Sequence, residues 1–525
     1  MLYWSNYLII INKEFYVIML SLVKSIALQG LAGAIIDIEV DVRQVGKPEV
    51  IMVGLPDTAV KESTERVKSA IRNSMKYFPE HKIVINLAPA DLKKEGATFD
   101  LPIAIGILMA NETIGMLNKK YVMVGELSLD GTIRAINGML PLLISAREQG
   151  LTDFIIPKGN EAEAAYIDGI NCYAFDKLFD VIAFLKGEET VEPVKKRVWK
   201  LPETESTDDF KRVKGQKQAK RAMEIAVSGG HNLMMVGPPG SGKTMLARCV
   251  PSILPDLTFE EALEITKIHS IAGVLDKRKG VVDSRPFRAP HHTASTVALT
   301  GGGKNAKPGE ISLAHNGVLF LDEMPEYARS LLETLRQPLE DGVITVARAS
   351  ASVTYPASFM LIASMNPCPC GNYGSKELEC KCTPTQIDKY HKKISGPLLD
   401  RIDLKIDVDR VKFLELRDEE SFEESSSEIK KRIEKARAIQ RERFKGEGFY
   451  TNAKMSAKHI KKYCEIDEKS EKLLQNAFEK FKMSARGYSR ILKVARTIAD
   501  LAGSENIQTP HLLEALSYRC SEKFN

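Results

Sequence analysis

The sequence predicts an α/β protein of three parts: a first α/β domain, a central parallel sheet covered by helices, and a helical C-terminal segment. Three observations support this prediction. Strand-like alternation and helix-like periodicity follow each other up to about residue 186, they do so again between residues 210 and 408, and only helix-like periodicity remains from residue 409 on. Strands that alternate with helices form parallel sheets whose faces the helices cover. The length of 525 residues agrees with about three domains at roughly 100–200 residues each.

The first domain is expected over residues 19–186. Apolar and charged residues alternate from Ile36 to Arg43, as in a half-buried strand. Asp57 precedes a stretch with apolar residues at helical spacing that ends near Asn73. The other predicted elements are strands at Val50–Val53 and Ile83–Leu87, helices at Leu101–Ala110 and Leu140–Gln149, and a hairpin that turns at Asp130 and Gly131.

A linker separates this domain from the central one. Residues 187–209 contain charged residues, Ser, Thr and Pro without any period, which is typical of an exposed linker. The central domain, residues 210–408, is predicted to contain helices at Gln216–Ser228 and Lys243–Ile253 and strands at Leu233–Val236, Val318–Leu321 and Phe359–Ala363. An acidic, serine-rich run then leads into residues 409–525, for which we predict an all-α lid.

The composition is that of an ordinary globular protein. The net charge is +5, 44% of the residues are hydrophobic and 27% are charged, which excludes bulk disorder and a membrane protein. The net charge is too small to indicate nucleic-acid binding by itself. Eight cysteines are too few for a disulfide scaffold, and four of them lie between Cys368 and Cys382, which indicates a local site in a reducing compartment. We therefore expect a cytoplasmic protein.

The apolar start of the chain predicts neither a signal peptide nor a membrane anchor. Asn6, Asn12, Lys13 and Glu14 interrupt the run well short of the ~20 apolar residues that a bilayer span needs, and no small-residue cleavage site follows. Clear patterning begins at Met19. We expect translation to start there and residues 1–18 to be a non-native extension.

A phosphate-binding loop is predicted at Gly237–Thr244. Its sequence GPPGSGKT matches G-x-x-x-x-G-K-[ST] at every fixed position and lies between an apolar strand and a helix. The glycines let backbone N–H groups point at phosphate oxygens, and the N-terminus of the helix adds partial positive charge. We expect Lys243 to contact the β- and γ-phosphates and Thr244 to contact Mg²⁺. The predicted nucleotide-binding residues are Gly237, Pro238, Pro239, Gly240, Ser241, Gly242, Lys243, Thr244 and Asp322.

Two acidic residues about eighty positions later complete this prediction. Asp322 and Glu323 end the apolar strand Gly317–Leu321, and ligands bind at the carboxyl ends of strands in open α/β sheets. We expect Asp322 to hold Mg²⁺ and Glu323 to activate the attacking water.

Four cysteines predict a structural zinc site. Cys368, Cys370, Cys380 and Cys382 form two C-x-C pairs separated by nine residues. Two pairs of thiolates on a short excursion of the chain can surround a tetrahedral Zn²⁺, although C-x-x-C is the more common spacing. Free thiols in a loop are the alternative. The pairs directly follow Asn366, so a metal there could brace the end of the preceding strand.

With these residues in place, the chain resembles an AAA+ ATPase, and more narrowly the magnesium-chelatase-like ATPases of the ComM/YifB family. The resemblance covers nearly everything after Met19 and rests on the stretches VKGQKQAKRAMEIAVSGGHNL, RPFRAPHHTAS, KPGEISLAHNGVLFLDEMPE, MNPCPCG, SGPLLDRIDL and SARGYSRILKVARTIADL. It implies that ATP and Mg²⁺ are the cofactors and that copies of the chain close into a hexameric ring.

The resemblance also assigns catalytic roles. It implies that Asn366 is the sensor 1 residue, which orients the attacking water. It implies that Arg401 is the arginine finger, which reaches the neighbouring subunit's nucleotide and stabilises charge on the γ-phosphate. Arg486 best matches the sensor 2 arginine, and Arg490, one turn along the same helix, is the alternative.

The first domain resembles the proteolytic domain of Lon, through the stretches KKEGATFDLPIAIGIL and VGELSLDGTIRAINGMLPLL. A Lon-type protease needs a serine activated by a lysine whose pKa is lowered. Here Thr98 stands at the serine position and Leu140 at the lysine position. We therefore predict a degenerate domain that serves assembly or substrate contact.

Basic residues in loops predict DNA as the substrate. Small residues and cations on loops of a ring suit contact with a phosphate backbone, and a merely solvated loop is the alternative. The predicted DNA-contacting residues are Arg285, Arg288, Lys304 and Lys307, together with Arg348 on a hairpin expected at Val343–Thr354. A second basic surface is predicted along residues 430–445, where a solvated helix face is again the alternative.

These observations predict an ATP-driven motor on single-stranded or branched DNA, most simply a branch-migration helicase. A chelatase-type remodelling ATPase that inserts metal into a tetrapyrrole is the alternative. The extra first domain and the cysteine cluster argue against that alternative, and Leu140 argues against an ATP-dependent protease. The expected partners are further copies of the chain and DNA, without a membrane.

Overall fold

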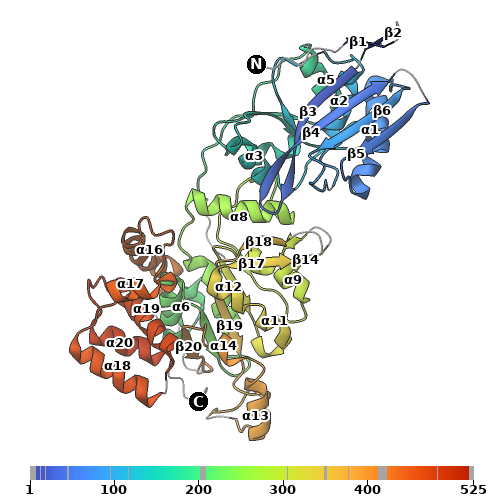
Figure 1. Ribbon diagram of the computed structural model, residues 1–525. Coiled ribbons are helices and arrows are strands. Elements are labelled where there is room, and N and C mark those ends of the chain that lie inside the picture. The colour runs from blue at the N-terminus through green and yellow to red at the C-terminus, as the bar shows by residue number, and fades with distance from the viewer. Residues whose placement is uncertain are drawn as a thin grey trace. The chain divides into compact units, whose positions relative to one another are not determined.

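The protein is described from a computed structural model (Figure 1). The structure describes residues 8–519 apart from residues 12–13, 18, 44–46, 95, 116, 202–207, 304–305, 348–351, 376–377, 412–422 and 482. The chain divides into two compact units. Unit 1 comprises Met1–Lys200 and Ala262–Val282, and unit 2 comprises Leu201–Glu261 and Asp283–Asn525.

Unit 1 is built on a mixed seven-stranded sheet with the order β11-β10-β7-β3-β4-β6-β5. Its strands are β3 (Met19–Gln29), β4 (Ala32–Arg43), β5 (Glu49–Val53), β6 (Lys82–Ala88), β7 (Val122–Met123), β10 (Asp153–Pro157) and β11 (Asn171–Phe175). Strands β3 and β4 form a long antiparallel hairpin. The predicted alternation in β4 is confirmed, because Ile36, Ile38 and Val40 are buried in the core of this unit.

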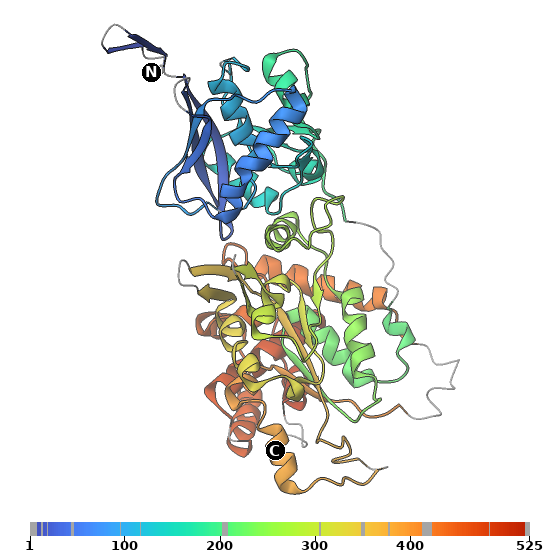
Figure 2. The same ribbon diagram turned by 90° about the vertical axis from the view of Figure 1, so that its right-hand side faces the viewer.

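Helices cover this sheet. They are α1 (Thr58–Met75), α2 (Asp100–Ala110), α3 (Met139–Glu148), α4 (Glu161–Ala164) and α5 (Leu178–Lys186), with β8 (Glu126–Leu127) and β9 (Ile133–Arg134) as the hairpin at Asp130 and Gly131. Helix α1 begins where predicted, because the Asp57 carboxylate accepts a 2.8 Å hydrogen bond from the N–H of Val60. Its buried Val67 and Ile71 pack into the core, and α1 and α2 lie side by side (Figure 2). A short hairpin of β1 (Leu8–Ile11) and β2 (Glu14–Val17) precedes the domain.

Unit 1 also contains a segment that the sequence analysis assigned to the central domain. Residues 262–282 include most of α8 (Phe259–Ala272) and belong to unit 1. Ser270 of this segment donates a 2.7 Å hydrogen bond to the buried carboxylate of Glu163 and accepts one from the N–H of Gly138. The structure therefore divides residues 210–408 between the two units. Patterns along the chain did not reveal this division, because the partners of Ser270 lie more than a hundred residues away.

Unit 2 contains a fully parallel five-stranded sheet with the order β13-β16-β19-β12-β20. The strands are β12 (Leu233–Val236), β13 (Phe287–Arg288), β16 (Val318–Leu321), β19 (Met360–Met365) and β20 (Leu404–Asp407). The three central strands β16, β19 and β12 are buried along their whole length. This agrees with the predicted parallel sheet under helices.

The connections of this sheet are mostly short helices and hairpins. The helices are α6 (Lys217–Gly229), α7 (Lys243–Cys249), α9 (Thr296–Thr300), α10 (Glu310–Leu313), α11 (Arg329–Glu333), α12 (Arg336–Asp341), α13 (Pro384–His391) and α14 (Gly396–Leu399). The hairpins pair β14 (Gly301–Gly302) with β15 (Lys307–Pro308) and β17 (Val343–Ala347) with β18 (Ser352–Pro356). The helix predicted over Lys243–Ile253 ends at Cys249 and continues as a 3₁₀ turn, since Pro251 lacks the N–H that an α-helix would need.

From Ser426 on, every described element of unit 2 is helical. These are α16 (Ser426–Arg443), α17 (Ala457–Tyr463), α18 (Glu468–Lys480), α19 (Ala485–Leu501) and α20 (Thr509–Ser517). They share one apolar core with the sheet, which includes Ile225 of α6, Ile433 of α16 and Ile498 of α19, and α16 and α19 both pack against α6 (Figure 1). Among the described helices of the chain, none is both long and apolar enough to cross a membrane.

Candidate functional site

The predicted nucleotide-binding residues gather at the carboxyl ends of three neighbouring strands. Strand β12 leads into the loop Gly237–Gly242, β16 leads into Asp322 and Glu323, and β19 leads into Asn366. The parallel order β16-β19-β12 brings these three ends to one edge of the sheet. Asn366 and Lys243 are far apart in the sequence, and the order of the strands in the sheet brings them together.

The loop after β12 has the backbone of a phosphate cradle. Gly240 and Gly242 have φ of 76° and 91°, a left-handed region that favours glycine. Gly237 is needed for close approach, because a Cβ there would lie 2.1 Å from the carbonyl oxygen of Val408. The hydroxyl of Ser241 is buried and has no hydrogen-bond partner among the described residues. The loop therefore offers a polar atom that a phosphate oxygen would satisfy.

Lys243 lies at the centre of the site. Its Nζ donates to the carbonyl oxygens of Gly237 at 2.6 Å and Pro238 at 2.9 Å, and to Oδ1 of Asn366 at 3.3 Å. Burial lowers the pKa of Lys243 to about 8, while Asp322 and Glu323 act in the opposite direction. A bound phosphate would favour the charged ammonium further and replace these neutral acceptors with anionic ones.

Thr244 and Asp322 form the part of the site that fits a metal ion. The Thr244 hydroxyl donates a 2.8 Å hydrogen bond to Oδ2 of Asp322, and Ser364 of β19 donates to Oδ1. A hydroxyl, a carboxylate and phosphate oxygens are the hard oxygen ligands that Mg²⁺ prefers. Ser364 was not predicted from the sequence, because a serine inside an apolar strand carries no signal of its partner.

Glu323 occupies a strained turn directly after Asp322. Its φ and ψ are both 49°, a left-handed conformation that costs free energy for a residue with a side chain. Its N–H donates to Ser364 Oγ and to Asp322 Oδ1, both at 3.1 Å. Its side chain is exposed, so the carboxylate remains accessible to a water molecule.

The predicted arginine finger and sensor 2 arginine bind the same carboxylate, and among the described residues neither of them contacts Lys243 or Asp322. Arg401 and Arg486 both donate to the carboxylate of Glu340 on α12. They line a cavity of about 450 Å³ that also includes Arg490, Lys454 and Lys493. Arg490 pairs with Asp403 at 2.9 Å instead. Five cationic residues thus line a second site, distinct from the phosphate loop.

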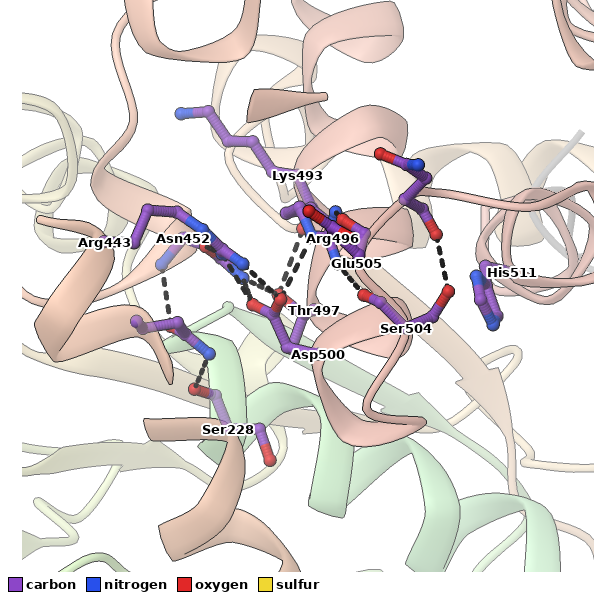
Figure 3. Close-up of polar contacts among 12 residues, drawn as sticks. Ser228, Arg443, Asn452, Lys493, Arg496, Thr497, Asp500, Ser504, Glu505 and His511 are labelled. Atoms are coloured by element: carbon purple, nitrogen blue, oxygen red, sulfur yellow. Dashed lines mark hydrogen bonds and ion pairs between the residues drawn. The ribbon is translucent and has the colours of Figure 1, made fainter. Parts of the chain in front are cut away.

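A buried polar network holds the helix that carries Arg486 and Arg490 (Figure 3). Asp500 of α19 accepts two hydrogen bonds from Arg443 of α16, at 2.5 and 2.7 Å, and one from Arg496. Asn452 donates to both Asp500 and Thr497. The Asp500 carboxylate therefore finds all its hydrogen-bond donors inside the fold, and these bonds hold α19 against α16.

The four cysteines converge as predicted. Their sulfur atoms all lie within 4.8 Å of one another, and three of the Sγ–Sγ distances are 3.4, 3.6 and 3.6 Å. A tetrahedral zinc site with bonds of about 2.3 Å has sulfurs about 3.8 Å apart, so the geometry fits this metal. The excursion that carries them, including α13, projects from the rest of unit 2 (Figure 2).

This cysteine excursion contacts the nucleotide site. Gly371 lies so close to the phosphate loop that a Cβ would fall 2.3 Å from Pro239. His391 of α13 bonds the carbonyl of Pro367 at 2.8 Å, directly after Asn366. The cluster therefore braces both the phosphate loop and the end of β19.

The residues predicted to contact DNA fall into three groups. Arg285 forms its hydrogen bonds within the chain. It pairs with Glu261 at 2.6 Å and donates to the carbonyl oxygens of Pro255, Asp256 and Asn316. Arg288 forms a two-pronged pair with Glu310. Lys307 is exposed on β15. Lys304 and Arg348 lie outside the described residues.

The basic residues of α16 are also largely paired. Lys430 contacts Asp256, Arg432 contacts Glu224 and Glu424, and Arg443 contacts Asp500. Arg437 is half-buried and donates to the carbonyl oxygen of Val227. The exposed cations of this helix are Lys431 and Lys435, and Lys445 follows its end. Four of the eight basic residues in the predicted second basic surface are therefore bound within the chain.

In unit 1, the two positions predicted to correspond to the serine and lysine of a Lon-type protease are ordinary parts of the fold. Leu140 is fully buried in α3, and its N–H donates to Glu163 at 3.1 Å. The carbonyl of Thr98 accepts from Gly125 at 2.9 Å. A leucine at this position supplies no amine that could activate a nucleophile.

Known proteins match nearly the whole length of this chain. The family model described as Magnesium chelatase, subunit ChlI, matches residues 209–416. The model described as Subunit ChlI of Mg-chelatase matches residues 38–160, and that of the subunit ChlI C-terminal matches residues 423–519.

Two full-length relatives are closely similar. The chain is 43% identical over 506 residues to Competence protein ComM of Haemophilus influenzae, covering 95% of this chain and 97% of that protein. It is 43% identical over 507 residues to protein YifB of Salmonella typhimurium, covering 96% and 98%. Magnesium-chelatase subunit ChlI of Euglena gracilis is more distant, at 25% identity over 250 residues, 42% of this chain and 66% of that protein. The chain therefore belongs to the ComM/YifB-type magnesium-chelatase-like proteins.

Proposed function

We propose that this protein is an AAA+ ATP hydrolase that works as a hexameric ring and couples ATP hydrolysis to movement on DNA, as a branch-migration helicase. The observation that carries the hydrolase part is the convergence of Lys243, Thr244, Asp322 and Asn366 at one sheet edge. Membership of the ComM/YifB family supports the choice of ATP over other ligands of a phosphate loop.

Each residue of the site has a role in this proposal. Lys243 and the loop N–H groups bind the phosphates, and Thr244 with Asp322 holds Mg²⁺, which neutralises phosphate charge. Glu323 accepts a proton from the attacking water, and Asn366 orients that water. The exposed side chain of Glu323, directly beside the carboxylate of Asp322, supports this division of labour between the two acids.

A ring is proposed because the catalytic arginines lie apart from the phosphate loop. Arg401 and Arg486 converge on Glu340, and neither has a contact with Lys243 or Asp322 among the described residues. Two arginines placed in this way suit a nucleotide bound by the next copy of the chain, where they would stabilise charge on the γ-phosphate. In this proposal Arg486 acts on the neighbour's nucleotide together with Arg401, and Arg490 has a structural role.

DNA contact is assigned to the hairpins of unit 2. Tyr355 of β18 donates a 2.8 Å hydrogen bond to the carbonyl of Ala306, which joins the β17–β18 hairpin to the β14–β15 hairpin. Lys304 lies in sequence between β14 and β15, and Arg348 lies in sequence between β17 and β18. Lys307 of β15 is exposed. Lys304, Lys307 and Arg348 thus remain the proposed phosphate contacts. Arg285 and Arg288 are withdrawn because they pair with Glu261 and Glu310.

The cysteine cluster is proposed to hold a structural Zn²⁺. Four thiolates at nearly tetrahedral separations satisfy a closed zinc site without an open position. Bound zinc would fix Gly371 against Pro239 and thereby the shape of the phosphate loop. Unit 1 is proposed to be a degenerate Lon-like domain that serves assembly or substrate contact.

The test is the ATPase rate measured with and without single-stranded and branched DNA. We expect stimulation by DNA that decreases as salt is raised, because phosphate contacts release counterions. ATPase activity without DNA stimulation and without salt-sensitive DNA binding would instead favour a chelatase-type remodelling ATPase.

A further inference from the structure

The carboxylate of Glu340 joins two arginines that come from distant parts of the chain. Arg401 follows α14 and Arg486 lies in the first turn of α19. Both direct an Nη2 atom to Glu340, one to each carboxylate oxygen, and the Arg486 contact measures 3.3 Å. One side chain on α12 thus keeps the two predicted catalytic arginines together.

The partners of this bridge differ strongly in burial. The side chain of Arg401 is 9% exposed, whereas those of Glu340 and Arg486 are 50% and 62% exposed. Exposed ion pairs are weak, because water and salt screen them. The Arg486–Glu340 pair is therefore weak, whereas the buried Arg401 needs an anionic partner. Glu340 can leave the bridge when another anion takes its place.

Arg401 has unused hydrogen-bonding capacity in this position. Its Nη1 donates to the carbonyl of Pro397 at 2.8 Å, and its buried Nε has no hydrogen-bond partner among the described residues. A guanidinium carries five N–H donors in a planar fork that matches carboxylate and phosphate oxygens. The fork is thus only partly satisfied by Glu340.

The surrounding cavity is cationic. Besides Arg401 and Arg486 it is lined by Arg490, Lys454 and Lys493. Two of its three acidic residues are already paired: Asp403 with Arg490 at 2.9 Å and Asp400 with Arg519 at 3.9 Å. Burial lowers the pKa of Lys454 and of Lys493, and at Lys493 the nearby Asp403 opposes this shift. Glu340 is the remaining acid, and it lies where an anion would meet both arginines.

We propose that Glu340 is a stand-in for phosphate: it binds Arg401 and Arg486 in the separate subunit, and the γ-phosphate of the neighbouring subunit's ATP displaces it when the ring forms. This inference rests on the proposed function, in which the two arginines act on the neighbour's nucleotide. Carboxylate and phosphate compete for the same guanidinium fork. Glu340 therefore keeps the arginines close together before assembly and opposes assembly until ATP is present.

The experiment compares four proteins: wild type, Glu340→Gln, Glu340→Asp and Asp341→Asn. The Asp341 variant is the matched control, because Asp341 is the exposed acidic neighbour on the same helix. Specific ATPase activity is measured against protein concentration and against ATP concentration. For Glu340→Gln we expect the protein concentration at half-maximal activity and the KM for ATP to fall about threefold or more, with kcat within about twofold of wild type, since only the competitor of the phosphate is removed. Glu340→Asp and Asp341→Asn should behave like wild type.

Two results would overturn the inference. If Glu340→Gln leaves both the protein concentration at half-maximal ATPase activity and the KM for ATP unchanged, Glu340 does not compete with the phosphate. A fall in kcat with unchanged assembly shows that Glu340 positions the arginines for chemistry. Comparing Glu340→Gln with wild type in an Arg401→Ala background adds a check, followed by light scattering of ring assembly because Arg401→Ala should not hydrolyse ATP. The effect of Glu340→Gln on assembly should disappear there, because the competing group acts through Arg401.

The same data separate this inference from the proposed function. If wild-type activity does not depend on protein concentration at all, the ring proposal fails, and the inference fails with it. If wild-type activity does depend on concentration and Glu340→Gln matches it, only the role of Glu340 is refuted.

Discussion

Arg490 donates to the carboxylate of Asp403 at 2.9 Å, two residues after the predicted arginine finger Arg401. The same carboxylate accepts from the N–H of Asn232, whose side chain holds the carbonyl of Arg401 at 2.8 Å. Burial opposes the ionisation of Asp403, but Arg490 and His231 outweigh this and hold its pKa below the usual range. Arg490 therefore supports the segment of Arg401, and it is not free to reach a nucleotide in the way that Arg486 is.

This relationship predicts opposite effects for the two arginines of α19. Arg490→Ala leaves a buried carboxylate without its ion-pair partner and should lower the free energy of unfolding by about 3–5 kcal/mol. Arg486→Ala removes an exposed side chain and should leave the melting temperature nearly unchanged while ATP hydrolysis falls at least ~10-fold. Thermal melting and ATPase assays on both variants test this assignment, and equal melting temperatures would contradict it.

The sign of the pH effect follows from the lowered pKa of Asp403. A carboxyl whose folded pKa is below its unfolded value contributes its full stability above the unfolded value of about 4 and loses it as pH falls toward the folded value. Without Arg490 the folded pKa should rise, so Arg490→Ala should unfold in acid at a higher pH than wild type. Acid titration followed by circular dichroism measures this shift, and Arg486→Ala is the control.

Lys243 and Glu323 should separate binding from chemistry. Lys243→Ala removes a contact to ground-state phosphates and should abolish ATP binding. Glu323→Gln keeps the binding residues but loses the proton acceptor, so it should bind ATP and hydrolyse it at least ~100-fold more slowly. Nucleotide binding by fluorescence and turnover by phosphate release distinguish the two, and near-wild-type turnover of Glu323→Gln would refute its assignment as the base.

Arg401 should act on the nucleotide of the next subunit. Arg401→Ala should bind ATP at its own loop and lose hydrolysis by ~10³-fold or more, as arginine fingers do. Mixed with Lys243→Ala subunits, it should regain partial activity, because some interfaces then combine an intact loop with an intact finger. Mixed rings that form without any recovery would argue against action between subunits.

The cysteine cluster should carry about one zinc per chain. Replacing Cys380 and Cys382 with serine leaves two sulfurs, which cannot complete a tetrahedral structural site, so zinc content should fall to background. Because Gly371 of this segment packs on Pro239, ATP affinity should fall with the metal. Elemental analysis of freshly reduced protein tests the site, and Cys172→Ala, in unit 1, should keep its zinc.

Loop cations should determine the salt dependence of DNA binding. Replacing Lys304, Lys307 and Arg348 with alanine should weaken binding to all sequences and flatten the slope of log affinity against log salt by about one unit for each lost contact. Basal ATPase activity should persist. Arg285→Ala is the contrast, since it removes an internal pair with Glu261 and should lower stability by ~2–4 kcal/mol without changing the slope. An unaltered slope in the triple variant would exclude these loops from DNA contact.

The sequence by itself determined the features that depend on short stretches of chain. The phosphate loop could be predicted because its glycines, Lys243 and Thr244 are consecutive, and left-handed φ values at Gly240 and Gly242 are a local property of the backbone. The strand β4 and the start of α1 at Asp57 were predictable for the same reason. The cysteine cluster was predictable because its members lie within fifteen residues and share one chemistry.

Only the tertiary structure decided which side chains meet over long distances. The pairing of Ser364 with Asp322, of Arg490 with Asp403 and of Arg285 with Glu261 each depends on how strands and helices pack. The sequence does not distinguish an arginine that binds an internal carboxylate from one that binds a phosphate. What separates the two cases is the burial and charge of its surroundings, and residues far apart in the chain create those surroundings.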